Sequence, residues 1–282
     1  MIDYVSISHK DNNSGSKLFE ISMPRFGLGV WQMSDMECEA SILHALNNGY
    51  RLIDTATAYG NETAVGEAIR KSEIPRDEIF VVTKLRRVHA TGFDETIIQC
   101  KESLERLGLD YVDLYLVHAP PENISVRGEV WKAMEECLKL GLTRSIGVSN
   151  YGIKHLEDMK NYAEIMPSVN QIEVHPWLQR HELREANRKI GAITMGYSPL
   201  ARGHKVRDPA LSTIADSIGC TPAQAAIKWV YDLGCITIPK SSNSNRIIEN
   251  KESLDFDISD YTADFTSLDE SYISGWNPTI EP

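Results

Sequence analysis

Cysteine is scarce in this sequence and forms no recognisable pattern. The 282 residues include five cysteines, an odd number, at Cys38, Cys100, Cys137, Cys220 and Cys235. No two of them form a CxxC pair, and none stands at metal-ligand spacing from a histidine. Neither a disulfide framework nor a zinc-binding motif is expected, and we interpret the chain as adapted to a reduced, cytoplasmic setting.

Long apolar runs and an excess of basic residues are also missing. No stretch approaches the roughly 20 apolar residues that span a bilayer, and the first residues lack the apolar core of a signal peptide. We therefore expect no membrane partner and no secretion. Lys and Arg number 29 against 40 Asp and Glu, and the resulting formal charge of −11 argues against nucleic acid as a partner. Any site for a phosphorylated ligand must then be built locally.

Metal-binding motifs are absent as well. The sequence contains neither an HExxH helix nor a cluster of carboxylates at strand ends, which disfavours a zinc hydrolase. Among the histidines outside the site proposed below, His44 falls in a predicted helix and His175 is expected to fix a loop. The others are expected on the surface: His9, His89, His155, His181 and His204.

Short aliphatic runs alternate with stretches of helical period along most of the chain. The predicted strands are residues 26–30, 51–54, 79–83, 112–117, 144–148, 169–172, 192–197 and 235–239. Helix starts are marked by Ser34 with Glu37 and by Thr221 before Pro222. Eight strand–helix units in succession predict a single domain over residues 1–282, of the α/β class, folded as a (β/α)8 barrel.

Two segments lie outside this repeat. Residues 17–21 and 23–26 are predicted to form a small hairpin that seals the barrel floor, and the tail after Leu254 is expected to be irregular. No linker or low-complexity segment divides the chain.

Polar side chains follow three successive predicted strands. Asp54 ends the second strand, with Tyr59 five residues later, while Lys84 and His118 follow the third and fourth strands. The carboxyl ends of barrel strands meet at one mouth, so these side chains are expected to converge. A tyrosine can donate a proton to a carbonyl oxygen if a lysine stabilises the phenolate that remains. Asp54 would hold Lys84, and His118 would orient the carbonyl.

Ordered motifs resemble those of the aldo-keto reductase superfamily over nearly the whole chain. They are Leu-Ile-Asp-Thr-Ala-x-x-Tyr at 52–59, Val-Thr-Lys-Leu at 82–85, Asp-Leu-Tyr-Leu-Val-His at 113–118, Ile-Gly-Val-Ser-Asn-Tyr at 146–151, Gln-Ile-Glu-Val-His-Pro at 171–176, Tyr-Ser-Pro-Leu at 197–200 and Ile-Pro-Lys-Ser at 238–241. The chain is most similar to the short-looped reductases of bacteria and yeasts, which are usually monomers. The resemblance implies a catalytic tetrad of Asp54, Tyr59, Lys84 and His118, acting on a small carbonyl substrate.

The resemblance also implies a dinucleotide site across the last four strands. Ser149, Asn150 and Gln171 would hold the nicotinamide carboxamide, although Asn150 could instead cap a helix. Tyr197 would stack on the nicotinamide, with Ser198, Leu200 and a flap at 201–208 along the pyrophosphate. Lys240 and Ser241 leave a strand, and Arg246 opens a helix, which indicates an anion site. In the family this anion is the adenosine 2′-phosphate, near Glu249 and Asn250, so NADPH is the expected cofactor.

The sequence departs from the family pattern at two substrate positions. Ala119 follows the strand-four histidine where tryptophan is common, and Arg86 stands where an aromatic is common. Trp31 and Trp276, with Trp177 as a further candidate, would then line the pocket. This pattern favours bulky or oxygen-rich carbonyls such as keto esters, diketones or keto acids, unless Arg86 points to solvent.

Two other functions remain open at this stage. Lys84 at a strand end is also typical of aldolases that form a Schiff base with their substrate. A cofactor-binding regulatory protein could use the same barrel, because a fold alone does not fix a function.

Overall fold

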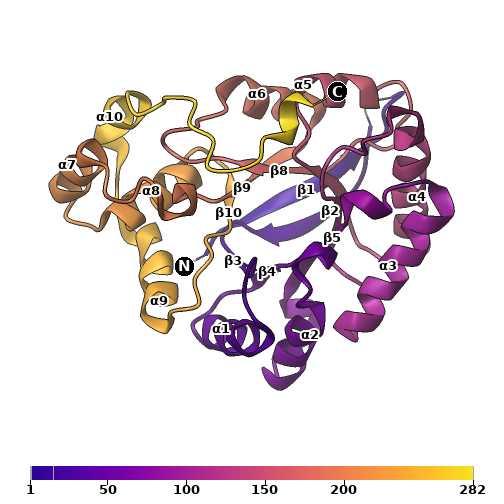
Figure 1. Ribbon diagram of the computed structural model, residues 1–282, viewed down its shortest axis with the longest axis horizontal. Helices are drawn as coiled ribbons and strands as arrows, with labels where there is room; N and C mark the ends of the chain where they lie inside the picture. Colours follow the sequence, from indigo (N-terminus) through magenta and orange to yellow (C-terminus); the bar gives the residue numbers. More distant parts are fainter. Residues whose placement is uncertain (1, 15, 282) are drawn as a thin grey trace.

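The computed structural model describes residues 2–14 and 16–281, and its centre is an eight-stranded parallel sheet. Strands that are consecutive in sequence are neighbours in the sheet, in the order β3 to β10 (Figure 1). The strands are β3 (Leu28–Gly29), β4 (Leu52–Asp54), β5 (Phe80–Leu85), β6 (Leu114–Val117), β7 (Ile146–Ser149), β8 (Val169–Glu173), β9 (Ile193–Tyr197) and β10 (Ile236–Thr237).

The first and last strands of this sheet meet and close it. The Gly27 N–H donates to the Thr237 carbonyl at 3.0 Å, and the Thr237 N–H donates to the Arg25 carbonyl at 2.8 Å. Parallel bridges also join Phe26 to Thr237 and Gly29 to Lys240. Closure leaves no open sheet edge, and the predicted (β/α)8 barrel is confirmed.

Helices surround the barrel and cover its outer face (Figure 1). One helix follows each barrel strand except β9, which is followed by two. They are α1 (Asp35–Asn47), α2 (Glu62–Lys71), α3 (Phe93–Leu107), α4 (Arg127–Lys139), α5 (Ile153–Met159), α6 (His181–Ile190), α7 (Pro209–Ile218), α8 (Pro222–Asp232) and α9 (Ser244–Glu252). The predicted capping box is present at Ser34, and the helix start predicted at Thr221 also has a capping box; each side chain accepts a bond from the backbone three residues on.

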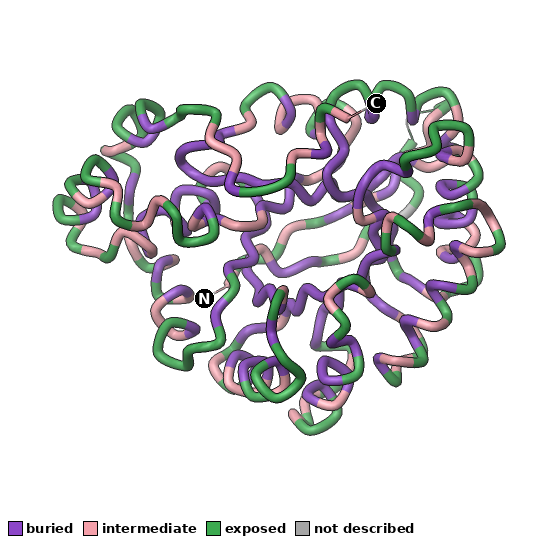
Figure 2. The backbone as a smooth tube through the Cα atoms, in the orientation of Figure 1, coloured by how far each residue is buried: buried purple, intermediate pink, exposed green. Residues whose placement is uncertain are grey.

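A hairpin closes the barrel floor, but its strands are not the predicted ones. It pairs β1 (Tyr4–Lys10) with β2 (Lys17–Pro24) in antiparallel fashion. The prediction of two strands at 17–21 and 23–26 is wrong, because one residue between them cannot form a hairpin turn. The turn lies earlier, where Asp11 accepts bonds from the following backbone. Ile7 and Met23 are buried in the core cluster inside the barrel, whose strands are buried along their length (Figure 2).

Two histidines that were expected on the surface are buried. His9 on β1 contacts the Met166 carbonyl through Nδ1 at 3.1 Å, while its Nε2 lies 2.9 Å from Ser145 Oγ. His155 on α5 contacts the Glu281 carbonyl at 2.9 Å. Both partners of His9, and Glu281 for His155, lie more than 100 residues away in the chain, so local sequence could not indicate that these rings are buried. The Nδ1 atom of His155 also accepts from the nearby Gly152 N–H at 2.9 Å.

The chain beyond Leu254 is largely irregular, as predicted. It contains α10 (Thr262–Thr266) and short 3-10 turns at Ser259–Tyr261 and Pro278–Ile280. The tail returns across the strand ends: the Ser274 N–H donates to Glu173 on β8 at 3.1 Å, and Arg180 donates to Asn277 at 2.8 Å. The C-terminal tail therefore forms part of the barrel mouth.

Candidate active site

Four predicted side chains come together at the carboxyl ends of β4, β5 and β6. Lys84 Nζ donates to Asp54 Oδ1 at 2.7 Å and lies 3.3 Å from the Tyr59 hydroxyl oxygen. The rings of Tyr59 and His118 meet edge to face, with centroids 5.6 Å apart. Three strand ends thus place a carboxylate, an ammonium, a phenol and an imidazole around one point.

A buried asparagine fixes the loop that carries Tyr59. Asn61 accepts a hydrogen bond from Thr55 Oγ1 at 2.8 Å and donates to the Val30 carbonyl at 2.9 Å. Between Thr55 and Asn61 the chain makes a short 3-10 turn, Thr57–Tyr59, and then reverses at Gly60, which has a φ of 73°. Sequence reasoning missed Asn61, because nothing local shows that this polar side chain is only 1% exposed.

Burial and mutual charge decide the protonation of the site. Burial, aided by the Asp54 carboxylate, raises the pKa of Tyr59 well above its usual value. Burial lowers the pKa of Lys84, although Asp54 opposes that shift. Burial and the nearby Lys84 charge lower the pKa of His118 to about 3. Around neutral pH the site therefore presents a protonated phenol and an uncharged imidazole.

A cavity of about 540 Å³ opens above these residues. Asp54, Tyr59 and His118 line its floor, while Lys84 lies fully buried below. Eight predicted cofactor residues line it as well: Ser149, Asn150, Gln171, Tyr197, Ser198, Leu200, Lys240 and Arg246. Residues from every barrel strand or the loop that follows it, except β5, contribute to this space.

A second cavity of about 480 Å³ adjoins the first and shares with it Leu200, Gly203, Lys240 and Arg246. The remaining predicted cofactor residues line this second cavity: Ser241, Glu249 and Asn250. Helix α9 begins here, capped by Asn243, whose side chain accepts from the Arg246 N–H at 3.1 Å. Within the described part of the chain, neither the Lys240 nor the Arg246 side chain forms a hydrogen bond or ion pair. Two unpaired cations and a helix N-terminus suit a phosphate group.

The predicted nicotinamide-side residues are hydrogen-bonded to the tetrad. Gln171 donates to Asp54 Oδ2 at 2.7 Å, and Asn150 donates to the His118 carbonyl at 2.9 Å. Tyr197 in turn donates to Asn150 Oδ1 at 2.8 Å. Asn150 does not cap a helix, because Gly152 occupies the cap of α5. These bonds link the wall of the cavity to its catalytic floor.

The predicted substrate residues divide into two groups. Trp31 and Trp276 line the cavity, whereas Ala119 is buried and Arg86 is exposed outside the lining. After Arg86 the chain turns, and Arg87 bonds instead to the Pro120 carbonyl at 2.8 Å and to Glu281 at 2.6 Å. Trp177 is also buried, with its indole N–H 3.2 Å from Asp208.

Among the lining residues with polar side chains, Gln32 and Arg202 were not predicted individually. Gln32 directly follows Trp31, and Arg202 falls within the predicted flap at 201–208. The sequence therefore indicated their segments but not the direction of their side chains.

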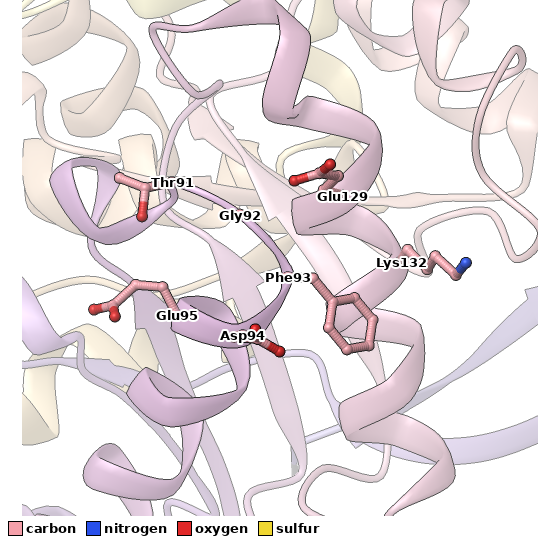
Figure 3. A pocket seen from close by; sticks show the side chains of 7 residues that line it. All are labelled: Thr91, Gly92, Phe93, Asp94, Glu95, Glu129 and Lys132. Carbon is pink, nitrogen blue, oxygen red and sulfur yellow. The ribbon is translucent and has the colours of Figure 1, made fainter.

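A separate depression of about 580 Å³ lies between the start of α3 and α4 (Figure 3). Its lining includes Asp94, Glu95 and Glu129 with Lys132, and it shares no residue with the two cavities at the barrel mouth. Among the described residues, no group of three or more His, Cys, Asp or Glu side chains could hold a metal ion. A search of the described helices also found none long and apolar enough to cross a membrane.

Comparisons with known proteins agree with this geometry. The model of the aldo/keto reductase family matches residues 23–273. An aldo-keto reductase of Mycolicibacterium vanbaalenii is 48% identical over 250 residues, which are 88% of this chain and 89% of that protein. A crystal structure of an aldo/keto reductase from Brucella melitensis is 39% identical, with a TM-score of 0.85 over 95% of this chain and 100% of that one. A Bombyx mori aldo-keto reductase, solved in complex with NADP, is 30% identical with a TM-score of 0.86, covering 98% and 95%.

Proposed function

Since the chain belongs to the aldo/keto reductase family of oxidoreductases, we propose that it reduces aldehydes and ketones to alcohols with NADPH. The observation that carries this proposal is the contact of Lys84 with both Asp54 and Tyr59, directly beneath a cavity that continues into a cationic one. A proton donor and a site for a phosphorylated cofactor thus share one continuous surface.

The protein's own residues supply the proton. The carbonyl oxygen binds between the Tyr59 hydroxyl and the His118 imidazole, both of which line the floor of the cavity. As negative charge develops on that oxygen, Tyr59 transfers its proton to it. The Lys84 ammonium, 3.3 Å from the phenol oxygen, then stabilises the phenolate, and Asp54 keeps Lys84 in place.

The residues around the two cavities fit NADPH. When bound, the dinucleotide supplies the hydride. Ser149, Asn150 and Gln171 hold its carboxamide, and Tyr197 packs on the nicotinamide. The unpaired Lys240 and Arg246, together with Ser241, bind the 2′-phosphate, which NADH lacks. The Bombyx mori relative solved in complex with NADP supports the choice of cofactor.

For the substrate, we propose bulky or oxygen-rich carbonyls such as keto esters and diketones. The structure supports this substrate class through the open cavity, which has the indoles of Trp31 and Trp276 in its wall. Arg86 and Ala119, which suggested this class from sequence, are outside the lining.

The rival aldolase reaction is disfavoured by the surroundings of Lys84. A Schiff base requires a free amine, but Nζ is engaged by Asp54, by the Thr55 carbonyl at 2.8 Å and by Tyr59. The lowered pKa of Lys84 is the single feature that suits an aldolase. Borohydride added together with an aldehyde should therefore leave Lys84 without a covalent adduct when peptides of the treated protein are examined by mass spectrometry, even where exposed lysines are modified.

The direct test follows NADPH absorbance with a panel of aldehydes, ketones, diketones and keto esters. We expect turnover with several of them, and faster turnover with the bulkier or oxygen-rich members. Tight NADPH binding without oxidation by any carbonyl would instead identify a regulatory binding protein.

A further inference from the structure

The guanidinium of Arg202 is held over the cavity by two neighbours from distant parts of the chain. Its central carbon lies 4.6 Å from the centroid of the Trp31 ring. On the other side it packs against Gly275 in the C-terminal tail, where a Cβ atom would come within 2.5 Å of the same carbon. A residue other than glycine at 275 would therefore displace the guanidinium. Trp31 and Gly275 together form a slot for this one side chain.

The backbone that carries Arg202 adopts an unusual conformation. Ala201 and Arg202 have φ of 46° and 54°, in the left-handed region that non-glycine residues rarely occupy. Two short backbone bonds hold the turn: Ala201 N–H to the Ser198 carbonyl at 2.8 Å and Gly203 N–H to the Leu200 carbonyl at 2.7 Å. A strained backbone of this kind persists only when the surrounding contacts stabilise it. In this turn, the conformation of Ala201 and Arg202 places the Arg202 side chain in the wall of the cavity.

The donors of Arg202 are unused within the described part of the chain. The side chain is exposed and lines the same cavity as Tyr59 and His118, but forms no hydrogen bond or ion pair there. Two other arginines near the mouth are engaged: Arg87 binds Glu281, and Arg180 binds Asn277. A positioned guanidinium with free donors suits a planar oxyanion, which it can bind through two parallel hydrogen bonds.

We propose that Arg202 binds an anionic group of the substrate, a carboxylate, so that carbonyl acids are favoured over their neutral counterparts. This inference rests on the proposed reductase function and names a substrate class for it. The pyrophosphate of the cofactor offers similar oxyanion chemistry. The substrate is the better match, because Arg202 is held between Trp31 and the residue next to Trp276, the two indoles of the substrate wall.

The test compares 3- and 4-carboxybenzaldehyde with their methyl esters, which differ in charge but not in the reacting aldehyde. For Arg202→Met, the ratio of acid to ester kcat/KM should fall about 10- to 100-fold for at least one isomer, the range expected of a charged hydrogen bond. Arg207→Met is the matched control: Arg207 is exposed, lies in the same segment and lines neither cavity. This control removes the same charge and should preserve the ratio.

Titration of NADPH into each variant, followed by protein fluorescence, separates the two oxyanions. An unchanged dissociation constant with a reduced acid-to-ester ratio supports the proposal. If Arg202→Met weakens NADPH binding and slows acid and ester equally, Arg202 binds the pyrophosphate and the proposal is wrong. An unchanged ratio for both isomers also refutes it.

Failure of the reductase function would be visible separately, as a wild-type protein that oxidises no NADPH with any of these aldehydes. In that case, calorimetric titration of the same acids and esters into the NADP⁺-saturated protein decides the question. If the wild type binds an acid and Arg202→Met weakens that binding 10-fold or more, the proposed anion site at Arg202 is supported. If both proteins bind the acid equally, the proposed anion site is refuted.

Discussion

Lys84 shows how burial and hydrogen bonding fix an ordinary side chain beside the proposed proton donor. The ammonium is fully buried, and its three donors are directed to Asp54, Thr55 and Tyr59. An unpaired charge in this position would be strongly destabilising, so Asp54 is needed for the fold of the site as well as for its chemistry. The same contacts leave the Tyr59 proton as the one that can be transferred.

Replacement of this proton donor is the sharpest test of the site. Tyr59→Phe removes only the hydroxyl, so kcat should fall by about two to four orders of magnitude, the usual contribution of a general acid. The dissociation constant of NADPH should change little, because Tyr59 lines the floor rather than the cationic cavity. Stopped-flow NADPH oxidation gives the rate, and fluorescence titration gives the affinity.

A matched control for this variant is Tyr50→Phe, which removes a buried hydroxyl whose bond goes to the Ile247 carbonyl at 2.7 Å, outside both cavities. Tyr50→Phe should lower the free energy of unfolding and leave kcat unchanged. Near wild-type turnover by Tyr59→Phe would show that another group donates the proton.

At this scale the sequence predicted which residue types converge, but not which way every side chain faces. Asp54 and His118 sit at strand ends, where the barrel geometry fixes their direction. Arg86 and Arg87 are adjacent in a loop, and only the turn at Arg87–His89 decides that Arg87 is directed to the tail. Arg202 could not be found in this way, because its neighbour Gly275 is more than 70 residues distant.

Helix α9 and the end of β10 form the element that we propose selects the cofactor. Arg246 stands in the first turn of α9, and its side chain forms no hydrogen bond or ion pair with the described residues. Arg246→Ala should therefore weaken NADPH binding by about one to two orders of magnitude. NADH, which lacks the 2′-phosphate, should be bound almost as before. Titration of both cofactors into both proteins measures the difference.

The control for this element is Arg207→Ala, at the same position as the control Arg207→Met above. It removes one positive charge outside both cavities. It reports any general effect of net charge on cofactor binding. Equal losses of NADH and NADPH affinity in Arg246→Ala would mean that Arg246 supports the loop and does not contact the phosphate.

The elements themselves were predictable where local signals are strong. The eight barrel strands follow from their aliphatic runs, and the capped helices from Ser34 and Thr221, because both signals act within a few residues. Strand ends were less certain: residues 235–239 were predicted as a strand, and β10 spans only Ile236–Thr237. The first strand of the floor hairpin, Tyr4–Lys10, was missed because only Val5 and Ile7 are aliphatic and the next inward position is taken by the polar His9.

Over the whole molecule, charge is distributed so that the site differs from its surroundings. The chain carries a formal charge of −11, yet Lys240, Arg246 and Arg202 all line the cavities without a hydrogen bond or ion pair in the described structure. An acidic protein repels an anionic cofactor at long range, so these local cations must provide the attraction. Salt screens both effects, but the short-range contacts inside the cavities are screened less.

The barrel floor makes the stability of the whole molecule depend on pH. His9 on β1 contacts the backbone at two points. Its Nδ1 contacts the Met166 carbonyl, and its Nε2 accepts from the N–H of Ile146, the first residue of β7, at 3.2 Å. Burial lowers its pKa to about 4, from an ordinary value of 6.5. Between these two pH values the unfolded chain binds a proton that the folded protein does not, so stability rises with pH. The contribution of His9 is complete above about pH 6.5 and is lost as the pH falls toward 4.

A shift of this size corresponds to roughly 3 kcal/mol of unfolding free energy over that window. His9→Gln replaces the imidazole by an amide that can form hydrogen bonds but cannot titrate, so urea unfolding should show wild type losing about that much more stability than the variant between about pH 7 and pH 4. His181→Gln is the matched control, because His181 is exposed at the start of α6 and its loss should leave the wild-type slope unchanged. Parallel pH dependence of wild type and His9→Gln would show that the buried imidazole accepts its proton without unfolding, and that the acid sensitivity of the barrel arises elsewhere.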